Sequence, residues 1–354
     1  MIAGMHWPGI IDRYRPYLNL DPDARPVTLL EGNTPLLPAP RLAAEIAPGG
    51  ELFLKVEGLN PTGSFKDRGM TVAITQAAHA GARVTLCAST GNTAASAAAY
   101  SARAGLRCIV LIPEGRVAAG KLAGALAYGA DAVAVQGSFD DALALVRGAA
   151  ARPSVALVNS INPYRIEGQK TAAFEIVDAL GRAPDWLCLP VGNAGNITSY
   201  WAGFQQYCAD GRCRSTPQLL GVQAAGAAPL VLGHAVDQPE TIATAIRIGR
   251  PARGAEALAA AEGSRGRIIA VTDDDIMAMR DRLARDGVWV EPASAAGVAG
   301  LAAEVRAGRI DPRGKVIVAV VTGHGLKDPD AVAARAHRVP SIPAERSALE
   351  GLIG

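Results

Sequence analysis

The feature that most constrains the fold is an alternation, from about residue 50 onward, of short apolar runs with longer helical stretches. The runs are rich in β-branched residues and apolar at consecutive positions, which is typical of strands buried on both faces. They lie at residues 52–56, 84–88, 108–112, 132–135, 155–158, 186–191, 268–271 and 316–321. Strands separated by helices of about 10 to 20 residues form βαβ units. The sequence therefore predicts an α/β fold of open, mostly parallel twisted sheets flanked by helices.

The chain length of 354 residues corresponds to two domains at about 150 residues per domain. Eight of the 23 prolines fall in the first 48 residues, so we expect residues 1–50 to form an irregular arm on the larger domain, with one short helix around residues 10–18. We expect an N-terminal α/β domain over residues 51–165 and a C-terminal α/β domain over residues 166–337, with interleaved chains and approximate bounds. Residues 338–354 contain Pro340 and Pro343 and are expected to form a tail.

The charge balance argues against a polyanionic partner. Charged residues make up 19% of the chain and leave a net charge of +2, which is too small for the basic surface of a nucleic-acid binder or of a protein held on an anionic membrane. No apolar run reaches the roughly 18 residues that a membrane helix needs, and the first residues are too polar for a signal peptide. We therefore expect a cytoplasmic protein that binds neither nucleic acid nor membrane.

The five cysteines are an odd number in a long chain, and only Cys208 and Cys213 lie close together in the sequence. Their spacing matches no zinc pattern and no disulfide framework, so we expect no metal site. Cys87, Cys108 and Cys188 lie in strand-like apolar runs and are expected to be small core residues.

Four polar, glycine-rich loops directly follow predicted strands, at residues 57–69, 89–93, 192–196 and 322–328. Ligands of open parallel sheets bind outside the carboxyl ends of strands, where loops lead into helices. The loop at residues 192–196 reads GNAGN, and its small residues let backbone N–H groups converge on a phosphate at a helix N-terminus; the alternative is a plain tight turn.

Two nucleotide-binding motifs are incomplete. The GNAGN loop lacks the GxGxxG spacing and an acidic residue about 20 positions later, so it does not support a dinucleotide site. The segment from Gly115 to Leu122 follows the P-loop spacing, but Leu122 stands where Ser or Thr would hold magnesium. Nucleotide hydrolysis is therefore disfavoured.

Lys66 and Asn92 carry the chemistry of the first two loops. Lys66 opens a predicted helix, whose positive dipole end lowers the pKa of the amine and favours a nucleophile; alternatively it is a solvated surface lysine. Asn92 follows a Ser-Thr-Gly turn and could equally cap a helix. The combination of an amine, an amide and a phosphate cradle, each on a loop after a strand, favours a functional site.

The motifs NPTGSFKDRG around Lys66, STGNTAAS around Asn92, GNAGN and TGHGLKD together resemble the threonine synthases, among the tryptophan-synthase-β-like (fold type II) pyridoxal phosphate enzymes. The similarity extends over nearly the whole chain and includes LLEGNTPL and NPYRIEGQKTAAFEI. The resemblance implies that pyridoxal phosphate is the cofactor and forms a Schiff base with Lys66, which then shuttles protons. It places Phe65 against the cofactor ring, Asn92 on the ring oxygen and Thr322 at the pyridine nitrogen. It assigns the cofactor phosphate to Gly192, Asn193, Ala194, Gly195, Asn196 and Ile197.

The same resemblance implies a carbon–oxygen lyase that converts O-phospho-L-homoserine and water to L-threonine and phosphate by γ-elimination and β-addition. It assigns the substrate phosphate to Thr93, Asn159, Ser160, Arg165 and Asn193, and the substrate carboxylate to Ser89, Thr90 and Gly91. Taken alone, Arg165 could also be a surface charge on a helix. A homodimer is expected from the resemblance only.

Three other functions remain open from the sequence. Serine or threonine dehydratases share the lysine and the asparagine but tend to carry a run of glycines in the phosphate loop, and sulfhydrylases favour a Gly-Thr-Gly-Gly-Thr type of loop. The loop here is GNAGN, which matches neither. A cofactor-binding protein without turnover is the third alternative, because a fold does not guarantee activity.

Overall fold

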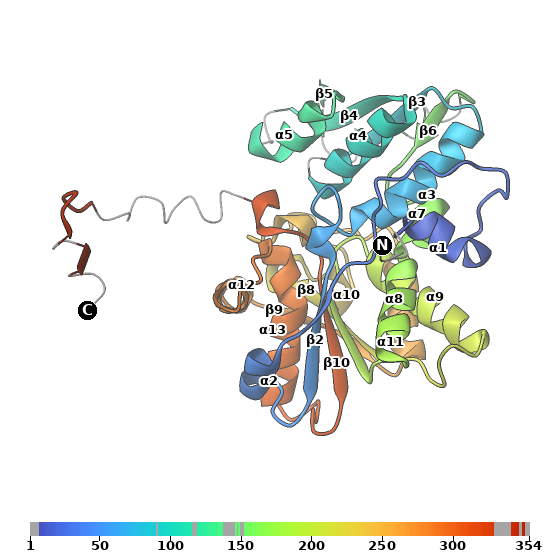
Figure 1. Cartoon of the computed structure of the whole chain (residues 1–354). Helices are drawn as coiled ribbons and strands as arrows, with labels where there is room; N and C mark the ends of the chain where they lie inside the picture. The colour runs from blue at the N-terminus through green and yellow to red at the C-terminus, as the bar shows by residue number, and fades with distance from the viewer. Residues whose placement is uncertain are drawn as a thin grey trace.

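Two β-sheets form the framework of the molecule (Figure 1). The computed structural model describes residues 7–89, 91–114, 119–136, 146, 148, 152–328, 341–346 and 349–350. The larger sheet has the strand order β1-β2-β10-β7-β8-β9 and the smaller one β5-β4-β3-β6. Helices flank both sheets, so the α/β fold predicted from the sequence is confirmed. Within the described ranges, no helix is both long and apolar enough to span a membrane.

The larger sheet is parallel except at one edge. Its strands are β1 (Leu36–Pro38), β2 (Glu51–Val56), β7 (Trp186–Pro190), β8 (Gln218–Ala224), β9 (Arg267–Val271) and β10 (Val316–Val321). Only β1 is antiparallel to its neighbour β2. The strands β1 and β8 were not predicted from the sequence. The strand β1 is a three-residue edge strand ending in Pro38, and Gly221 and Gln223 interrupt the apolar run of β8.

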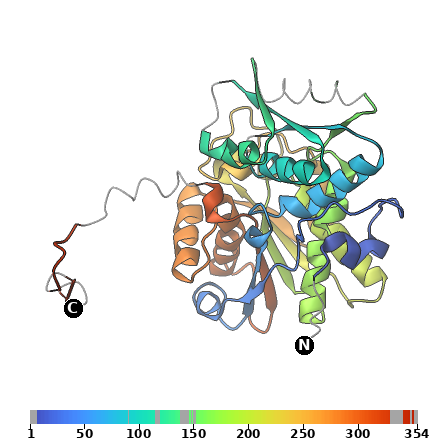
Figure 2. The same cartoon turned by 45° about the horizontal axis from the view of Figure 1, so that its top comes forward.

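The smaller sheet is entirely parallel. It contains β3 (Val84–Ala88), β4 (Arg107–Pro113), β5 (Asp131–Val135) and β6 (Val155–Leu157), and the helices α3 (Lys66–His79), α4 (Asn92–Ala104) and α5 (Ala119–Ala127) accompany it (Figure 2). These strands lie in the sequence between β2 and β7 of the larger sheet. The strand β2, which we expected within the first α/β domain, is thus a member of the larger sheet. The expected domain bounds themselves stay a prediction.

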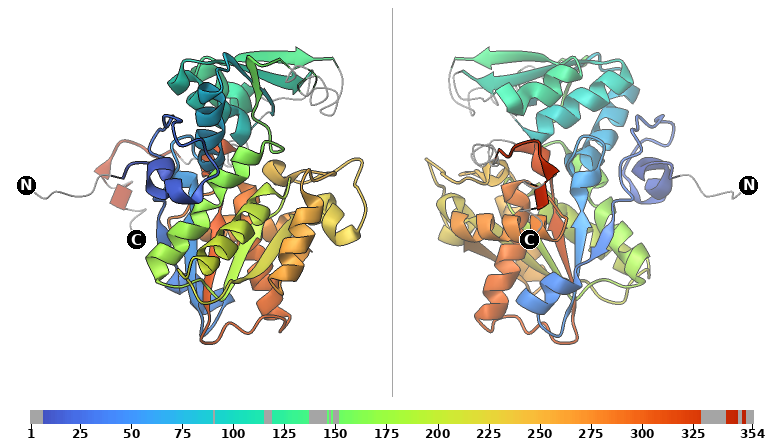
Figure 3. Two further views of the ribbon diagram at one scale, coloured as in Figure 1. Left: turned by 90° about the vertical axis from the view of Figure 1, so that its right-hand side faces the viewer. Right: turned by 60° about the vertical axis from the view of Figure 1, so that its left-hand side comes forward.

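Helices cover both faces of the larger sheet (Figure 3). They are α8 (Thr171–Leu180), α9 (Gly195–Ala209), α11 (Gly254–Gly263), α12 (Asp273–Arg285) and α13 (Pro292–Arg306), with the short α2 (Pro40–Ile46) and α10 (Pro229–Leu232). Successive residues of β10 enter opposite cores. Ile317 and Ala319 pack in the core that contains α13, whereas Val318 and Val320 pack in the core that contains α8 and α9. This alternation is the period-2 pattern of a strand buried on both faces.

The N-terminal arm carries α1 (Ile10–Tyr14), followed by a 3-10 turn at Arg15–Tyr17, and packs through aromatic rings. The ring centroids of Tyr14 and Tyr17 lie 5.4 and 5.2 Å from that of Phe174 on α8. Phe174 in turn stacks on Tyr207 of α9 at 4.0 Å. The arm is therefore held on two helices of the larger sheet.

Three of the cysteines are free and two are joined in a disulfide. Cys87, Cys108 and Cys188 are free and buried, as the sequence predicts. Cys208 and Cys213 form a disulfide, which corrects the expectation of a chain without a disulfide framework. The helix α9 ends at Ala209, and Gly211 adopts a φ of 73°, so the chain turns back and brings Cys213 to Cys208.

A buried cluster of charges joins the arm, β2, α3 and α8. The Arg68 guanidinium donates to both Glu57 oxygens at 2.7 and 2.8 Å and to both Glu175 oxygens at 2.7 Å. Lys55 donates to Glu175 at 2.6 Å and to the Thr34 carbonyl at 2.7 Å. Burial opposes ionisation of Glu175, but Arg68 and Lys55 lower its pKa to about 2. Two cations and two anions thus compensate one another away from water.

Replacing Arg68 with Met is expected to lower the free energy of unfolding by about 3–5 kcal/mol, because two buried carboxylates lose their main partner. Urea denaturation followed by circular dichroism measures this loss. Arg313→Met removes an exposed arginine that pairs with Asp311 and is the matched control, with an expected change within about 0.5 kcal/mol. Equal losses in the two variants would contradict this account of the cluster.

Candidate active site

The loops that the sequence singles out follow the carboxyl ends of β2, β3, β7 and β10, and the structure connects three of them directly. The backbone N–H of Phe65 donates to the Thr322 carbonyl at 3.0 Å, and Ser64 and Gly323 form a β-bridge. Asn92, in the loop after β3, is hydrogen-bonded to Glu291, whose backbone N–H donates to the Gly323 carbonyl at 3.1 Å. Residues distant in the sequence therefore meet in one place.

Lys66 is the first residue of α3, and its Nζ lies 3.7 Å from the centroid of the Phe65 ring. Burial and then the positive charge of Arg165 lower the pKa of Lys66 to about 7, while Glu291 opposes this shift. The direction of this shift is the one predicted from the sequence, and burial and Arg165 are two causes that the sequence did not predict. A substantial fraction of the amine is thus neutral near pH 7.

Helix packing places Arg165 next to the helix that carries Lys66. The helix α7 (Pro163–Gln169) meets α3 backbone to backbone, since a Cβ atom on Gly168 would lie 1.8 Å from the Arg68 carbonyl oxygen. A Cβ atom on Gly69 would lie 2.7 Å from the Nε of Arg165. Only residues without side chains allow this close approach.

Arg165 is a buried cation with an unused donor. Its side chain is 1% exposed, and its Nη1 donates to the Val158 carbonyl at 2.9 Å. Its Nε has no hydrogen-bond partner among the described residues. Burial lowers the pKa of Arg165 to about 10, which leaves the group protonated near neutral pH. A buried, protonated guanidinium with a free donor favours an anionic ligand.

The loop at residues 192–196 has the geometry of an anion site. Ala194 adopts a left-handed φ of 66° and precedes α9, for which no described side chain provides a cap. The first N–H groups of a helix lack acceptors within the helix. The Nδ2 of Asn196 is buried and has no partner among the described residues. A phosphate at this end of α9 would satisfy these donors, so the loop fits the phosphate of the expected cofactor.

Neighbouring residues close around this loop. Gly192 lies against Ile246, where a Cβ atom would be 3.1 Å from the Ile246 Cα. The side-chain oxygen of Asn193 accepts a long hydrogen bond of 3.5 Å from the Ala252 backbone, and Ile197 is fully buried.

Thr322, at the end of β10, is held by a neighbouring hydroxyl. Its Oγ1 lies 2.9 Å from the Oγ of Ser294, which accepts a hydrogen bond of 2.8 Å from the Gly323 backbone. Ser294 lies on α13 and is fully buried. The position of the Thr322 hydroxyl is therefore fixed by two elements.

Most of the described residues expected around the substrate lie on two adjoining segments, after β3 and after β6, whereas Asn193 lies in the loop after β7. Asn159 accepts from the Ala88 N–H at 3.0 Å and donates to the Ala88 carbonyl at 2.8 Å, which ties the segment after β6 to the end of β3. The Ser160 carbonyl accepts a hydrogen bond of 3.3 Å from Arg253. Thr93 is buried on α4.

The loop after β3 leaves room at its turn. The Gly91 N–H donates to the Ser89 hydroxyl at 3.4 Å, and a Cβ atom on Gly91 would meet nothing within 4 Å. Thr90, which we expected beside them, lies outside the described residues, as do Gly115 and most of the expected C-terminal tail.

Two polar residues of the site, Glu291 and Asp67, were not assigned a role from the sequence. Glu291 follows an apolar pair, Trp289 and Val290, and no motif marks it. Asp67 accepts from the Thr62 N–H and hydroxyl and from Ser96, all at 2.6 Å, and burial raises its pKa to about 6. Only adjacency to Lys66 in the sequence could have pointed to Asp67.

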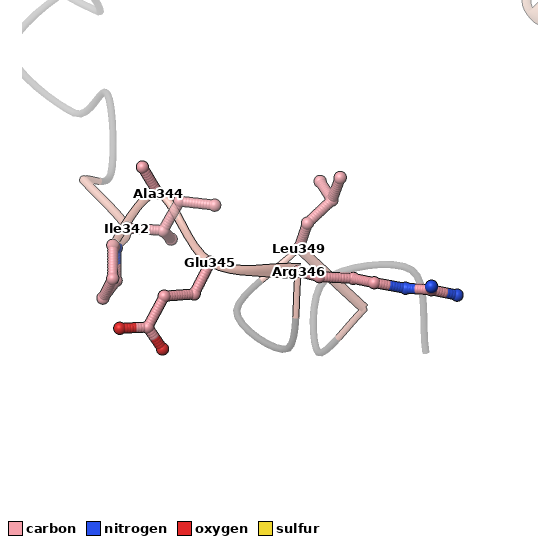
Figure 4. Close-up of a pocket in the computed structure, with 6 residues that line it drawn as sticks. Ile342, Ala344, Glu345, Arg346 and Leu349 are labelled. Atoms are coloured by element: carbon pink, nitrogen blue, oxygen red, sulfur yellow. The ribbon is translucent and has the colours of Figure 1, made fainter.

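A further hollow lies on the C-terminal segment (Figure 4). It is lined by Ile342, Pro343, Ala344, Glu345, Arg346 and Leu349. One short segment supplies all of these residues, and none of the expected site residues is among them. The hollow is separate from the candidate site in sequence and composition.

In cofactor-free protein, Lys66 is expected to react as a neutral amine with a midpoint near pH 7, whereas an ordinary lysine has a pKa of about 10.4. Competitive labelling with acetic anhydride across a pH series, quantified by peptide mass spectrometry, gives this midpoint, with the exposed Lys315 as the internal comparator. Arg165→Gln removes a neighbouring positive charge and should move the midpoint to higher pH. Identical pH profiles for Lys66 and Lys315 would refute the expectation.

Comparison with known proteins adds independent information. The model of the family described as "Pyridoxal-phosphate dependent enzyme" matches residues 27–323. Threonine synthase of Mycobacterium leprae (strain TN) is 56% identical over 350 residues, which are 98% of this chain and 96% of that protein. Threonine synthase of Synechocystis sp. (strain ATCC 27184 / PCC 6803 / Kazusa) is 58% identical over 329 residues, with shares of 93% and 85%.

Solved structures share the fold at low sequence identity. Maize serine racemase superposes with a TM-score of 0.75 at 20% identity, over 93% of this chain and 94% of that one. The processed form of threonine deaminase isoform 2 from Solanum lycopersicum gives a TM-score of 0.71 at 23% identity, over 83% and 80%. The fold type II architecture is thereby confirmed. By its sequence, its fold and its relatives, the chain belongs to the pyridoxal-phosphate dependent enzymes and, among them, to the threonine synthase family.

Proposed function

We propose that the protein converts O-phospho-L-homoserine and water to L-threonine and inorganic phosphate. The observation that carries this proposal is the presence of two separate sets of unsatisfied anion donors. One set lies at the start of α9 with Asn196, and the other is the buried Nε of Arg165 on α7. A phosphorylated substrate bound beside a phosphorylated cofactor brings two such anions into one site.

Bound pyridoxal phosphate supplies the electron sink for bond changes at the carbon atoms of the amino acid. The chain's own contribution is to hold and orient this group. We assign its phosphate to the residues of the Gly192–Ile197 segment and its ring to Phe65. The amide of Asn92 is assigned to the ring oxygen and the hydroxyl of Thr322 to the pyridine nitrogen. A hydroxyl at that nitrogen, unlike a carboxylate, does not require the nitrogen to stay protonated.

Lys66 is the group that moves protons in this proposal. Elimination of a γ-phosphate and addition of water at Cβ require protons to be taken from and returned to the substrate carbons. A base works best when its pKa lies near the working pH, and the pKa of Lys66 is lowered to about 7. Its amine lies beside Phe65, the residue that we assign to the cofactor ring, and would therefore be next to the bound cofactor.

The substrate's own anions are assigned to the two adjoining segments after β3 and β6, together with Asn193 in the loop after β7. We propose that Thr93, Asn159, Ser160, Arg165 and Asn193 bind its phosphate, and that Ser89, Thr90 and Gly91 bind its carboxylate. The double hydrogen bond between Asn159 and Ala88 supports this, because it fixes one segment relative to the other. The open space at Gly91 supports a ligand close to that backbone.

We further infer a homodimer in the cytoplasm. The support for self-association is a group of exposed apolar side chains beside the site: Leu59, Trp289 and Leu326. The Trp289 ring lies 5.4 Å from the His324 ring, and the Trp289 carbonyl accepts a hydrogen bond from the Gly325 N–H, so Trp289 adjoins the segment that carries Leu326. Burying such a patch against a second copy would remove apolar area from water.

The function is tested by incubating the protein, supplied with pyridoxal phosphate, with O-phospho-L-homoserine. We expect threonine and inorganic phosphate to form in equal amounts, and Lys66→Ala to abolish both products while retaining a folded circular dichroism spectrum. Phosphate with a 2-oxo acid instead of threonine would indicate a dehydratase-like lyase. Full activity of Lys66→Ala would make the assigned role of Lys66 wrong.

Arg165→Gln is expected to raise the KM for O-phospho-L-homoserine by about 100-fold, because a charge-assisted contact with the phosphate is lost. The matched measurement uses L-serine, which carries no γ-phosphate, so any turnover of this amino acid should change little. Steady-state kinetics with both substrates provide the comparison. An equal loss for the two would contradict the assignment of Arg165 to the substrate phosphate.

A further inference from the structure

We propose that Glu291 is a positioning residue of this site: it orients the carboxamide of Asn92 and provides the negative charge that faces the Lys66 amine. The proposal rests on the assignment of Lys66 and Asn92 to the cofactor, and it adds a residue to which neither the motifs nor the comparisons assign a role. Glu291 is a carboxylate with 5% exposure in the middle of the candidate site.

Three backbone features fix the location of Glu291. It immediately precedes α13, and its side chain makes no capping bond to that helix, so the carboxylate is directed elsewhere. The preceding residue, Val290, forms a β-bridge with His324, and the N–H of Glu291 donates to the Gly323 carbonyl. A Cβ atom on Gly323 would lie 2.4 Å from the Glu291 Oε1. The carboxylate thus lies directly on the turn after Thr322.

The contact with Asn92 fixes which end of the amide faces which way. The Nδ2 of Asn92 lies 3.0 Å from each oxygen of Glu291. An ionised carboxylate only accepts hydrogen bonds, so the NH2 end of the amide must face it. The Nδ2 carries two hydrogens, and one of them remains available for the ring oxygen that we assign to Asn92. A neutral carboxyl group could donate to the other end of the amide and would no longer select this orientation.

The same carboxylate acts on Lys66 through its charge. Glu291 raises the pKa of Lys66, against burial and against Arg165. Burial raises the pKa of Glu291 itself, while Asn92, Lys66 and Lys327 oppose that shift and Asp328 adds to it. The charged groups that act electrostatically on Glu291 are therefore Lys66 from α3 and Lys327 and Asp328 from the segment after β10. Without the negative charge of Glu291, the pKa of Lys66 would be subject to burial and to Arg165, which both lower it.

The test uses Glu291→Gln, which keeps the size of the side chain and removes its charge. In cofactor-free protein, competitive labelling is expected to move the midpoint of Lys66 to lower pH by about one unit, the size typical of losing one nearby opposite charge. The dissociation constant of pyridoxal phosphate, measured by equilibrium dialysis, is expected to rise about tenfold because the Asn92 amide loses its orientation. Glu45→Gln, on α2, is the matched control and should change neither quantity.

A double variant separates the two roles. In an Asn92→Ala background, Glu291→Gln should cause no further loss of cofactor affinity, since the amide through which it acts is gone, yet the Lys66 midpoint should still fall. Additive losses of affinity, or an unchanged midpoint, would overturn the proposal.

A second variant, Glu291→Asp, separates the effect of charge from that of side-chain length. It retains the charge on a shorter side chain, so it should leave the Lys66 midpoint close to that of the parent protein and still weaken cofactor binding. A midpoint that shifts as far as in Glu291→Gln would refute the role of charge. None of these measurements uses O-phospho-L-homoserine. If the shifts occur and no threonine forms, the role of Glu291 stands and the proposed reaction is what fails.

Discussion

The buried guanidinium of Arg68 is the interaction on which the site depends. It lies two residues after Lys66 and is clamped by Glu57, which follows β2, and by Glu175, on α8. Because charges removed from water are tolerated only when fully paired, the start of α3 has little freedom to move relative to the larger sheet. Lys66 therefore inherits its position from a cluster that takes no part in the chemistry. The same cluster holds the arm, through Thr34, against the helix that bears Lys66.

The site itself is short of negative charge before any ligand binds. Within the described part of the chain, the Nε of Arg165 has no hydrogen-bond partner, and the first turn of α9 presents uncapped donors. Glu291 is the carboxylate that acts on Lys66 in the opposite sense. This imbalance suits a site that must hold a phosphorylated cofactor and a phosphorylated substrate together. The lowered pKa of Lys66 has the same origin, since the positive charge of Arg165 and the loss of water act in the same direction.

The sequence predicted those parts of the structure that have a local cause. Buried parallel strands are continuously apolar, so all the predicted strands were found, whereas β8 was missed because Gly221 and Gln223 break its pattern. The loops after β2, β3, β7 and β10 were recognised by their glycines and polar residues. Glu291 was not, because its significance comes from a contact with Asn92 that spans 199 positions. The origin of the lowered pKa of Lys66 was likewise hidden, since it lies in a helix pair that meets at Gly69 and Gly168.

The position of β10 in the sheet has a consequence for the order in which the chain can acquire its structure. This strand is the last in the described sequence, yet it lies between β2 and β7 at the centre of the larger sheet. As the chain leaves the ribosome, the four strands of the smaller sheet are all available long before β10 emerges. The larger sheet stays divided into two groups of strands until that moment. The Thr322 end of the site is thus completed last, and a chain released before β10 would carry Lys66 beside a complete smaller sheet and an unfinished larger one.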